Sequence, residues 1–191
     1  MTLFPVSADA SLPDAPRVVH PGMEPDLTPE QKTLFASFEA LGIATITWRH
    51  IPVFTMAESD FLKEAIPGTH GRSLLLTNKS GGFWMVSAAD ETKIDLKYLS
   101  DQLQTPRFSF AKPEQMVELL GVTPGSLTPF AAMFDTDCKV QVILDAWLMQ
   151  QESCVFHPLL NIYSTAMHIP DLQRFMNAHH HPPRIMELSP R

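Results

Sequence analysis

The chain is poor in cysteine and has no long apolar run. Two of its 191 residues are cysteines, Cys138 and Cys154, which are too few and too isolated for a disulfide framework or a thiolate metal site. No apolar stretch approaches the roughly 20 residues that cross a bilayer. The first residues also lack the basic start and long apolar segment of a secretory signal. We therefore expect a soluble cytoplasmic protein that has no membrane partner.

Several motifs of common enzyme classes are missing as well. The sequence has no Gly-x-Gly-x-x-Gly, no phosphate-loop Gly-Lys-Ser/Thr and no Gly-x-Ser-x-Gly, so nucleotide-cofactor, kinase-like and serine-hydrolase functions lose their usual support. The net charge is −7, of which residues 1–30 carry −4, with five acidic residues against one arginine. A body that carries only −3 argues against broad coating of DNA or RNA, but it still allows one nucleic-acid terminus to dock.

The chain has enough apolar residues, 45% of the total, to bury one core. Residues 1–27 contain five prolines among small and acidic residues, and we expect a flexible extension that contributes nothing to the core. Residues 28–191 are predicted to form one α+β domain with a mixed, strongly curved β-sheet and surrounding short helices. The predicted helices are 29–41, 57–66, 95–103, 113–120 and 170–178, and the predicted strands are 43–50, 72–77, 83–87, 107–110, 130–134, 139–144, 162–167 and 184–188.

The loop at residues 119–130 carries two glycines and two prolines between apolar segments. Gly125 can take a positive φ and bring bare backbone close to a ligand, whereas Pro129 fixes φ and donates no hydrogen bond. Neighbouring amides are then free to point at a ligand. A structural turn between a helix and a strand is the alternative interpretation of this loop alone.

Six of the eight histidines fall into two groups. Residues 179–181 are consecutive at a predicted helix end, cannot all face one metal and are interpreted as a surface cluster. His50, His70 and His157 lie at strand or loop boundaries, where functional groups are often mounted, although each alone is more typical of a structural residue. Arg72 opens a strand, either as a solvated charge or as a planar fork for a phosphate or carboxylate.

Seven segments occur in an order that resembles one known family. Together they resemble the YbaK/ProX family of aminoacyl-tRNA deacylases, and in particular the branch that clears alanine from proline tRNA. The resemblance runs from about residue 28 to residue 188. The segments are His-x-Pro-Val-Phe-Thr at 50–55, Pro-Gly-x-His at 67–70, Leu-Leu-Leu at 74–76, Ile-Asp-Leu-Lys at 94–97, Phe-Ser-Phe-Ala at 108–111, Leu-Gly-Val-x-Pro-Gly-Ser-Leu-Thr-Pro-Phe at 120–130 and Phe-His-Pro-Leu-x-Asn at 156–161.

The resemblance implies a mixed-sheet α+β fold and hydrolysis of the ester that joins an amino acid to the terminal adenosine of tRNA. It implies that the loop at residues 125–129 surrounds the aminoacyl group with backbone amides. The ribose hydroxyl of the tRNA assists, so no protein nucleophile, cofactor or metal is expected. The implied partner is the acceptor end of an aminoacylated tRNA, here tRNA(Pro), with prolyl-tRNA synthetase as a further partner.

One segment departs from the family pattern. Where the family commonly has Thr-Lys-Asn, this chain has Gly71-Arg72-Ser73, so Arg72 stands where the family has its lysine. The resemblance assigns catalytic roles to Arg72, Gly125 and His157. It assigns substrate binding to the following residues: His50, Phe54, Ser73, Ser126, Leu127, Thr128, Pro129 and Asn161.

Two alternatives stay open at this point. The chain can be a module that binds an aminoacyl-tRNA end or an amino-acid-like ligand without turnover, because the lysine is gone. It can also deacylate a different amino acid, such as serine, threonine or cysteine, with the pocket reset by Arg72 and Ser73.

Overall fold

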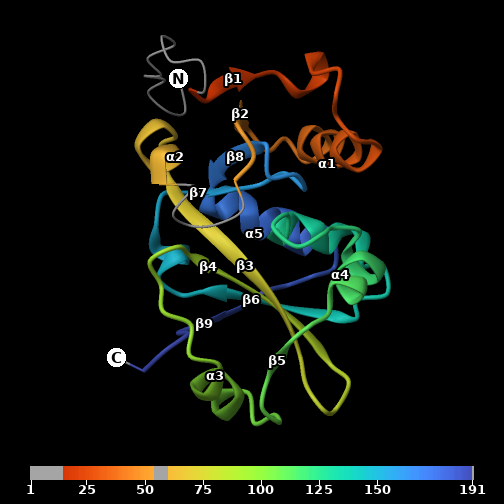
Figure 1. The fold of residues 1–191 in the computed structure, drawn as a ribbon, viewed down its shortest axis with the longest axis vertical. Helices are drawn as coiled ribbons and strands as arrows, with labels where there is room; N and C mark the ends of the chain where they lie inside the picture. The colour runs from red at the N-terminus through yellow and green to blue at the C-terminus, as the bar shows by residue number, and fades with distance from the viewer. Residues whose placement is uncertain (1–14, 54–59, 191) are drawn as a thin grey trace.

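The computed structural model describes residues 15–53 and 60–190, which form a mixed nine-stranded sheet with short helices around it (Figure 1). The strand order is β1-β2-β8-β7-β3-β4-β6-β9, and β5 pairs with β3 outside this path. The pairs β7·β3, β4·β6 and β6·β9 are parallel and the others are antiparallel. The predicted α+β fold with a mixed sheet and short helices is confirmed. The strands are β1 Arg17–Val19, β2 Thr45–Arg49, β3 Thr69–Thr77, β4 Phe83–Ala89, β5 Ser109–Phe110, β6 Val140–Asp145, β7 Ser153–Phe156, β8 Tyr163–His168 and β9 Arg184–Met186.

Helices cover both faces of the sheet. Successive side chains of a strand point to opposite faces, and here apolar side chains on each face are buried against helices. On β4, Met85 belongs to the cluster beneath α1, α4 and α5, whereas its neighbours Trp84 and Val86 pack with α3 on the opposite face. α2 packs on the β2-β8-β7 part of the sheet through Leu62. None of the helices in the described ranges has the length and apolar character to span a bilayer. The helices are α1 Pro29–Ala40, α2 Asp60–Ala65, α3 Leu96–Gln102, α4 Pro113–Leu120 and α5 Ile169–Ala178, with 3₁₀ turns η1 Pro21–Met23, η2 Pro129–Phe134 and η3 Leu148–Gln150.

Local sequence signals set the first helix as predicted. The Thr28 hydroxyl accepts a hydrogen bond from the Gln31 amide, and the Gln31 side chain accepts one from the Thr28 amide, each at 3.2 Å. This capping box satisfies two of the amides that a helix leaves unpaired. The Gln31 Nε2 also donates to the Pro158 carbonyl at 2.8 Å, so the helix start holds the loop after β7 in place.

Residues 15–27 correct one expectation from the sequence. β1 pairs with β2 in antiparallel register, with Val18 opposite Trp48, and the side chains of Val19 and Leu27 are buried with Tyr163. The expectation that everything before residue 28 contributes nothing to the core is therefore wrong for this segment, because proline-rich composition does not prevent short strands at a sheet edge. Residues 1–14 lie outside the described residues.

The predicted strand at residues 130–134 is also wrong. These residues belong to the 3₁₀ turn η2, whose start is capped by the Thr128 hydroxyl, which accepts from the Phe130 amide at 3.4 Å. A short apolar run is compatible with a strand or a buried helical turn, and only tertiary packing decides. The sequence also gave no prediction for β7, a four-residue strand that is buried along its whole length.

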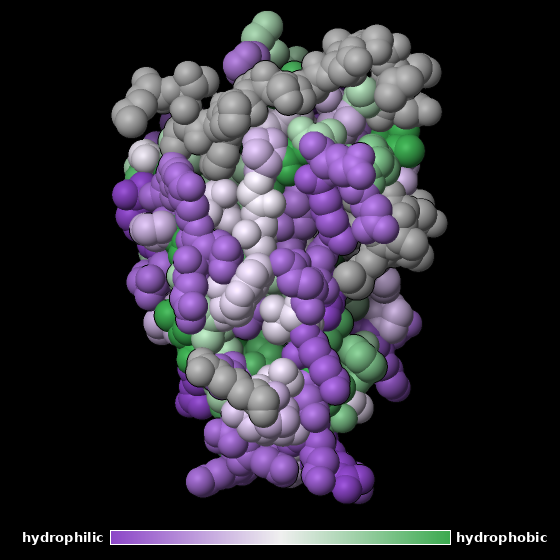
Figure 2. All heavy atoms as spheres, turned by 90° about the vertical axis from the view of Figure 1, so that its left-hand side faces the viewer, coloured by the Kyte–Doolittle hydropathy of each residue, from purple (hydrophilic) through white to green (hydrophobic). Residues whose placement is uncertain are grey.

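The exposed surface carries its large hydrophobic residues singly. Figure 2 shows hydrophilic residues spread over the side of the molecule that faces left in Figure 1, with hydrophobic residues in small separate groups. Isolated exposed hydrophobic residues are normal on soluble domains. The described ones are Val18, Met23, Ile51, Phe110, Val117, Trp147 and Ile185.

Candidate functional site

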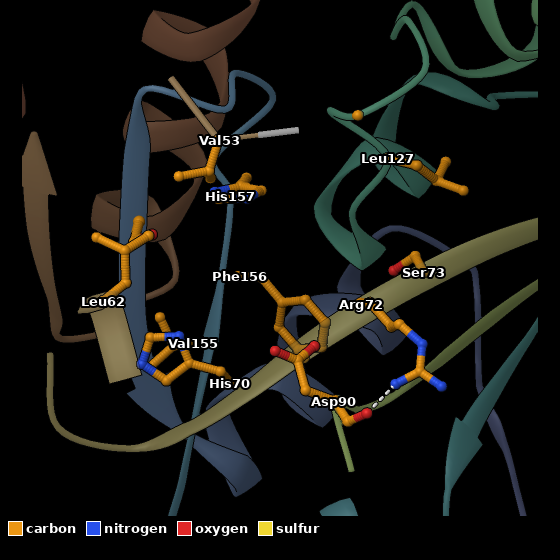
Figure 3. A pocket seen from close by; sticks show the side chains of 13 residues that line it. Val53, Leu62, His70, Arg72, Ser73, Asp90, Leu127, Val155, Phe156 and His157 are labelled. Carbon is orange, nitrogen blue, oxygen red and sulfur yellow. Dashed lines mark hydrogen bonds between the residues drawn. The ribbon is translucent and has the colours of Figure 1, made fainter. Parts of the chain in front are cut away.

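A cavity of about 250 Å³ lies where β3, β7 and the loop before η2 meet. In Figure 3, Val53 and His157 lie on the side opposite Leu127, and β3 runs below them with Arg72 and Ser73. Both apolar and polar groups line the wall, as is typical of small-ligand sites. The lining residues are Val53, Leu62, His70, Gly71, Arg72, Ser73, Asp90, Gly125, Leu127, Val155, Phe156, His157 and Ser164.

Gly71 on β3, together with Gly68 just before the strand, allows β3 to approach β7 closely enough to form this wall. A Cβ on Gly71 would lie 2.4 Å from Cζ of Phe156, far inside van der Waals contact. Gly68 has a φ of +122°, and a Cβ there would lie 2.9 Å from Cγ2 of Val155. Gly71 and Gly68 therefore let the Phe156 ring and the Val155 side chain fill the space beside β3.

The loop at residues 125–129 contributes two residues to the wall. Gly125, with a φ of +87°, and Leu127 line the cavity. The Ser126 amide donates to the Thr123 carbonyl at 3.0 Å, whereas the amides of Gly125 and Leu127 have no hydrogen-bond acceptor among the described residues. These two amides are the groups with which the loop can bind a ligand oxygen.

Three other residues assigned to this loop do not line the cavity. Ser126 is buried, Thr128 is fully buried and caps η2, and Pro129 begins η2. Their positions are those of residues that hold the loop against the core.

Arg72 lines the cavity, but its guanidinium is engaged by the backbone. Nη1 donates to the carbonyls of Ala89, at 3.0 Å, and of Asp90, and Nη2 donates to the carbonyl of Thr92 at 2.8 Å. Figure 3 shows the guanidinium directed toward the backbone of Asp90. A planar fork can span several carbonyls in this way, which a lysine ammonium cannot do with the same geometry. The side chain therefore holds the turn after β4.

Ser73 faces the same cavity from the next position of β3. Its hydroxyl shares a 2.7 Å hydrogen bond with the hydroxyl of Ser87 on β4. A hydroxyl has one donor and two acceptor lone pairs, so Ser73 retains capacity for two further partners.

The three histidines at strand and loop boundaries lie near one another, with His50 buried and His70 and His157 partly buried. His157 Nδ1 lies 2.8 Å from the Tyr163 carbonyl, and His70 Nε2 lies 2.9 Å from the Ile66 carbonyl. Because a carbonyl only accepts, these nitrogens carry the protons, which leaves His157 Nε2 and His70 Nδ1 as acceptors in the neutral rings. Burial lowers the pKa of both rings. Both residues line the cavity as neutral groups at pH 7.

His50 lies behind the cavity wall rather than in it. Its ring centroid is 5.9 Å from that of His157, and its Nε2 is 2.9 Å from the hydroxyl of Ser164, which does line the cavity. Nδ1 lies 2.7 Å from the Ile51 carbonyl and is the protonated nitrogen. Burial lowers the pKa of His50 to about 4, so the neutral ring accepts from Ser164 and orients it.

The remaining two residues implied by the resemblance have different outcomes. The Asn161 amide donates to the Val53 carbonyl at 2.9 Å and so fixes the segment that carries Val53, without lining the cavity itself. Phe54 lies outside the described residues.

The structure adds lining residues that sequence reasoning missed, and Asp90 is the charged one among them. It follows Ala89 at the end of β4, and its amide donates to the His70 carbonyl at 2.9 Å. Lys63 Nζ on α2 lies 3.4 Å from Oδ2 of Asp90 and 3.1 Å from Oδ1 of Asp60. Partial burial opposes the charge of Lys63, but the hydrogen bond to Asp60 and the nearby Asp90 raise its pKa overall.

The hairpin register could have indicated Asp90. Gly71 pairs with Ala89, so the next residue after β4 must lie beside His70. The apolar lining residues gave no comparable signal, because Leu62, Val155 and Phe156 read simply as core. Across the described residues, no group of three or more histidine, cysteine or acidic side chains has the arrangement of a metal site.

Comparison with known proteins identifies the family of this chain. Residues 51–175 match the family described as aminoacyl-tRNA editing domain. The chain is 26% identical over 159 residues to the prolyl-tRNA editing protein ProX of Acetoanaerobium sticklandii, an alignment that covers 83% of this chain and 97% of that protein. It is 31% identical over 152 residues to the prolyl-tRNA synthetase associated domain-containing protein 1 of Bos taurus, with 77% and 88% covered.

The fold is shared with solved structures of low sequence identity. The crystal structure of a candidate trans-editing enzyme for prolyl tRNA synthetase superimposes with a TM-score of 0.63 at 15% identity, over 87% of this chain and all of that one. Such a likeness establishes the architecture, and the sequence match establishes the kinship. The chain belongs to the aminoacyl-tRNA editing domain family, in the YbaK/ProX group that its ordered motifs resemble.

Proposed function

We propose that this protein is a trans-editing hydrolase that deacylates mischarged tRNA, with alanyl-tRNA(Pro) as its substrate. The observation that carries the proposal is the small cavity with two available loop amides, in a member of the aminoacyl-tRNA editing domain family. Its volume of about 250 Å³ corresponds to roughly eight water molecules at ~30 Å³ each, which is enough for an alanyl ester and an attacking water. The names of the matched relatives, which refer to prolyl-tRNA editing and to prolyl-tRNA synthetase, support the choice of tRNA.

In the proposed reaction, water attacks the ester carbonyl carbon and the bond to the ribose oxygen breaks. The amides of Gly125 and Leu127 donate to the carbonyl oxygen as it gains negative charge. The unprotonated Nε2 of His157 accepts a hydrogen bond from the water or from the ribose hydroxyl, and Ser73 contacts the aminoacyl group. The leaving ribose oxygen takes up a proton, so the products are the free amino acid and uncharged tRNA.

Other residues act on this site indirectly in the proposal. His50 orients Ser164, Asn161 fixes the Val53 segment, and Arg72 holds the turn after β4. The side chain of Leu127 forms the wall that excludes the proline ring, since a steric wall discriminates better than the loss of one or two methylene contacts.

The proposed partner is the acceptor end of tRNA(Pro) in the cytoplasm, with prolyl-tRNA synthetase as a second partner. A net charge of −7 is consistent with docking of one terminus rather than coverage of the tRNA body. The editing domain in this proposal comprises residues 28–191 together with strand β1, which pairs with β2.

The test is a deacylation panel. Purified protein is incubated with tRNA(Pro) carrying alanine, serine, cysteine or proline, and amino-acid release is compared with spontaneous hydrolysis of each ester. Alanine should be released at least ~10-fold faster than proline, and Leu127→Ala should narrow that ratio by admitting the larger ring. Lys79→Ala, in the exposed β3–β4 turn, is the matched control. No release above the spontaneous rate from any ester would overturn the enzymatic function.

A second candidate is a binding module of the same fold without turnover. The engagement of Arg72 by three backbone carbonyls favours it, because no free cation stands at the position where the family has lysine. Tight binding of alanyl-tRNA(Pro) without release in the same panel would assign this function instead.

A further inference from the structure

Asp90 places a carboxylate in a cavity whose other polar groups are neutral or already engaged. The rings of His70 and His157 are held neutral by burial, and the guanidinium of Arg72 is bonded to three backbone carbonyls. The loop amides can bind an ester oxygen, and the His157 ring can accept a hydrogen bond from a water. Of the two charged side chains in the lining, Arg72 holds the turn after β4, and Asp90 has no role in the proposed hydrolysis.

The backbone of Asp90 is fixed on both sides. Its amide donates to the His70 carbonyl at 2.9 Å, and its own carbonyl accepts from Arg72. The turn is held further by the second nitrogen of Arg72 on the Thr92 carbonyl. A carboxylate mounted on a backbone held in this way can meet a ligand in a defined geometry without paying for the ordering of a loop.

One oxygen of the Asp90 carboxylate is available to a ligand. Oδ2 faces Lys63 Nζ at 3.4 Å, while Oδ1 has no hydrogen-bond partner among the described residues. Asp90 lines the cavity, and its side chain is 9% exposed. In Figure 3 the carboxylate is directed between His70 and Phe156, away from the guanidinium of Arg72.

Lys63 leaves Asp90 free to accept a second cation. Its side chain is 34% exposed and it divides its contacts between Asp90 and the solvent-exposed Asp60, at 3.1 Å from the latter. Because Lys63 is partly solvated and also pairs with Asp60, it neutralises the charge of the Asp90 carboxylate only in part. The cavity side of Asp90 therefore attracts a compact cation that donates hydrogen bonds.

We propose that Asp90 binds the α-ammonium group of the aminoacyl ester and so restricts the site to esters of amino acids with a free amine. This inference rests on the proposed function and adds a specificity-determining residue to it. The ammonium group is attached one carbon from the ester carbonyl, so a substrate whose carbonyl meets the amides of Gly125 and Leu127 presents its ammonium to the same small cavity. Charge-assisted hydrogen bonds are the strong class in buried sites, which makes this contact selective.

The test compares two esters of the same tRNA(Pro). Alanyl-tRNA carries the ammonium group, and lactyl-tRNA, made from it by deamination with nitrous acid, carries a hydroxyl at the same carbon. Each enzymatic kcat/KM is divided by the spontaneous hydrolysis rate of that ester, because the ammonium group also activates the ester chemically. The wild-type ratio of alanyl to lactyl should be ~10- to 100-fold, the range for one hydrogen bond to a charged group.

Asp90→Asn keeps the shape and the backbone contacts and removes the charge. It should lower the normalised kcat/KM for alanyl-tRNA by about the same factor and leave lactyl-tRNA within about threefold. Asp137→Asn, which removes an exposed carboxylate paired with Lys139 and not part of the cavity lining, is the control and should keep the wild-type ratio. A wild-type ratio near one would overturn the inference, and this result does not depend on whether the variant folds. An equal loss on both esters in Asp90→Asn would overturn it as well.

A binding measurement separates this inference from the proposed function. The non-hydrolysable amide analogues 3′-alanylamido- and 3′-lactylamido-deoxyadenosine are titrated into wild type and Asp90→Asn by calorimetry. Preference for the alanyl analogue in wild type and its loss in the variant support Asp90 even if no ester is hydrolysed. Equal affinity for both analogues in wild type refutes the role of Asp90, whatever the deacylation panel gives.

Discussion

Replacing Arg72 by alanine should destabilise the protein, because this side chain supports a turn. The guanidinium donates three hydrogen bonds, to the carbonyls of Ala89, Asp90 and Thr92. Hydrogen bonds from a charged donor contribute about 1.5–3 kcal/mol each and are not additive, so we expect the free energy of unfolding to fall by about 2–4 kcal/mol in total. For a chain of this size, 1 kcal/mol corresponds to about 2–4 °C in Tm, so Tm should fall by about 4–16 °C.

The assay is urea and thermal unfolding followed by circular dichroism. Arg72→Lys restores the charge but, as a point charge, can reach only part of the carbonyl set, and should recover less than half of the lost stability. Lys79→Ala, on the exposed turn of the same hairpin, should change the free energy of unfolding by less than about 0.5 kcal/mol. The turn carries Asp90, so deacylation measured below the melting range should also fall more in Arg72→Ala than in Lys79→Ala.

A specific result would refute this reasoning. If Arg72→Ala melts with wild type and loses only activity, the guanidinium acts on substrate and its bonds to the turn contribute nothing measurable. Equal activity in Arg72→Ala and Lys79→Ala would remove Arg72 from the site altogether.

Three further predictions follow from packing and burial. Gly71→Ala places a methyl group against the Phe156 ring and should lower the free energy of unfolding, measured in urea, by about 1–3 kcal/mol. Gly22→Ala, which has open space around it, should be nearly neutral. Equal urea midpoints for the two variants would contradict the packing. The pKa of His50 is about 4 in the folded protein and 6.5 in the unfolded chain. The neutral ring therefore contributes fully to the free energy of unfolding above pH 6.5, and about 3 kcal/mol of that free energy is lost as the pH falls toward 4. If the free energies of unfolding of wild type and His50→Gln have the same dependence on pH, this prediction is wrong. A thiol reagent should label the exposed Cys138 in the native protein and should label the buried Cys154 only after unfolding, because burial raises the pKa of Cys154 to about 12. Fast labelling of both thiols in the native protein would contradict the structure.

Local signals were sufficient for much of the fold. The capping box at Thr28 and Gln31 and the hairpin around the turn at residues 78–82 are set by neighbours in sequence, and both are confirmed. The predictions failed where tertiary contacts decide. Residues 130–134 are apolar in a way that suits a strand, but Thr128 caps them into a 3₁₀ turn that packs beneath α5.

The candidate site was predictable only in part, for a related reason. Gly125, Leu127, Ser73, Arg72 and His157 line one cavity, and the roles that the resemblance assigns to them stay predictions. The carbonyls to which Arg72 donates and the position of Asp90 beside His70 depend on the strand pairing, which brings the end of β4 back to the start of β3. A residue type at a position indicates which bonds a side chain can make, whereas the register decides which of them it makes.

The open sheet ends in two very short strands, and this has a consequence for how the protein behaves at high concentration. β1 and β9, at the two ends of the strand order, are each three residues long. Pro16 and Pro21 flank the first, and Pro182 and Pro183 precede the second. Proline donates no backbone hydrogen bond, so neither end can be extended into a long ladder by a second chain. The prolines near the two termini thus protect an unclosed sheet against edge-to-edge aggregation.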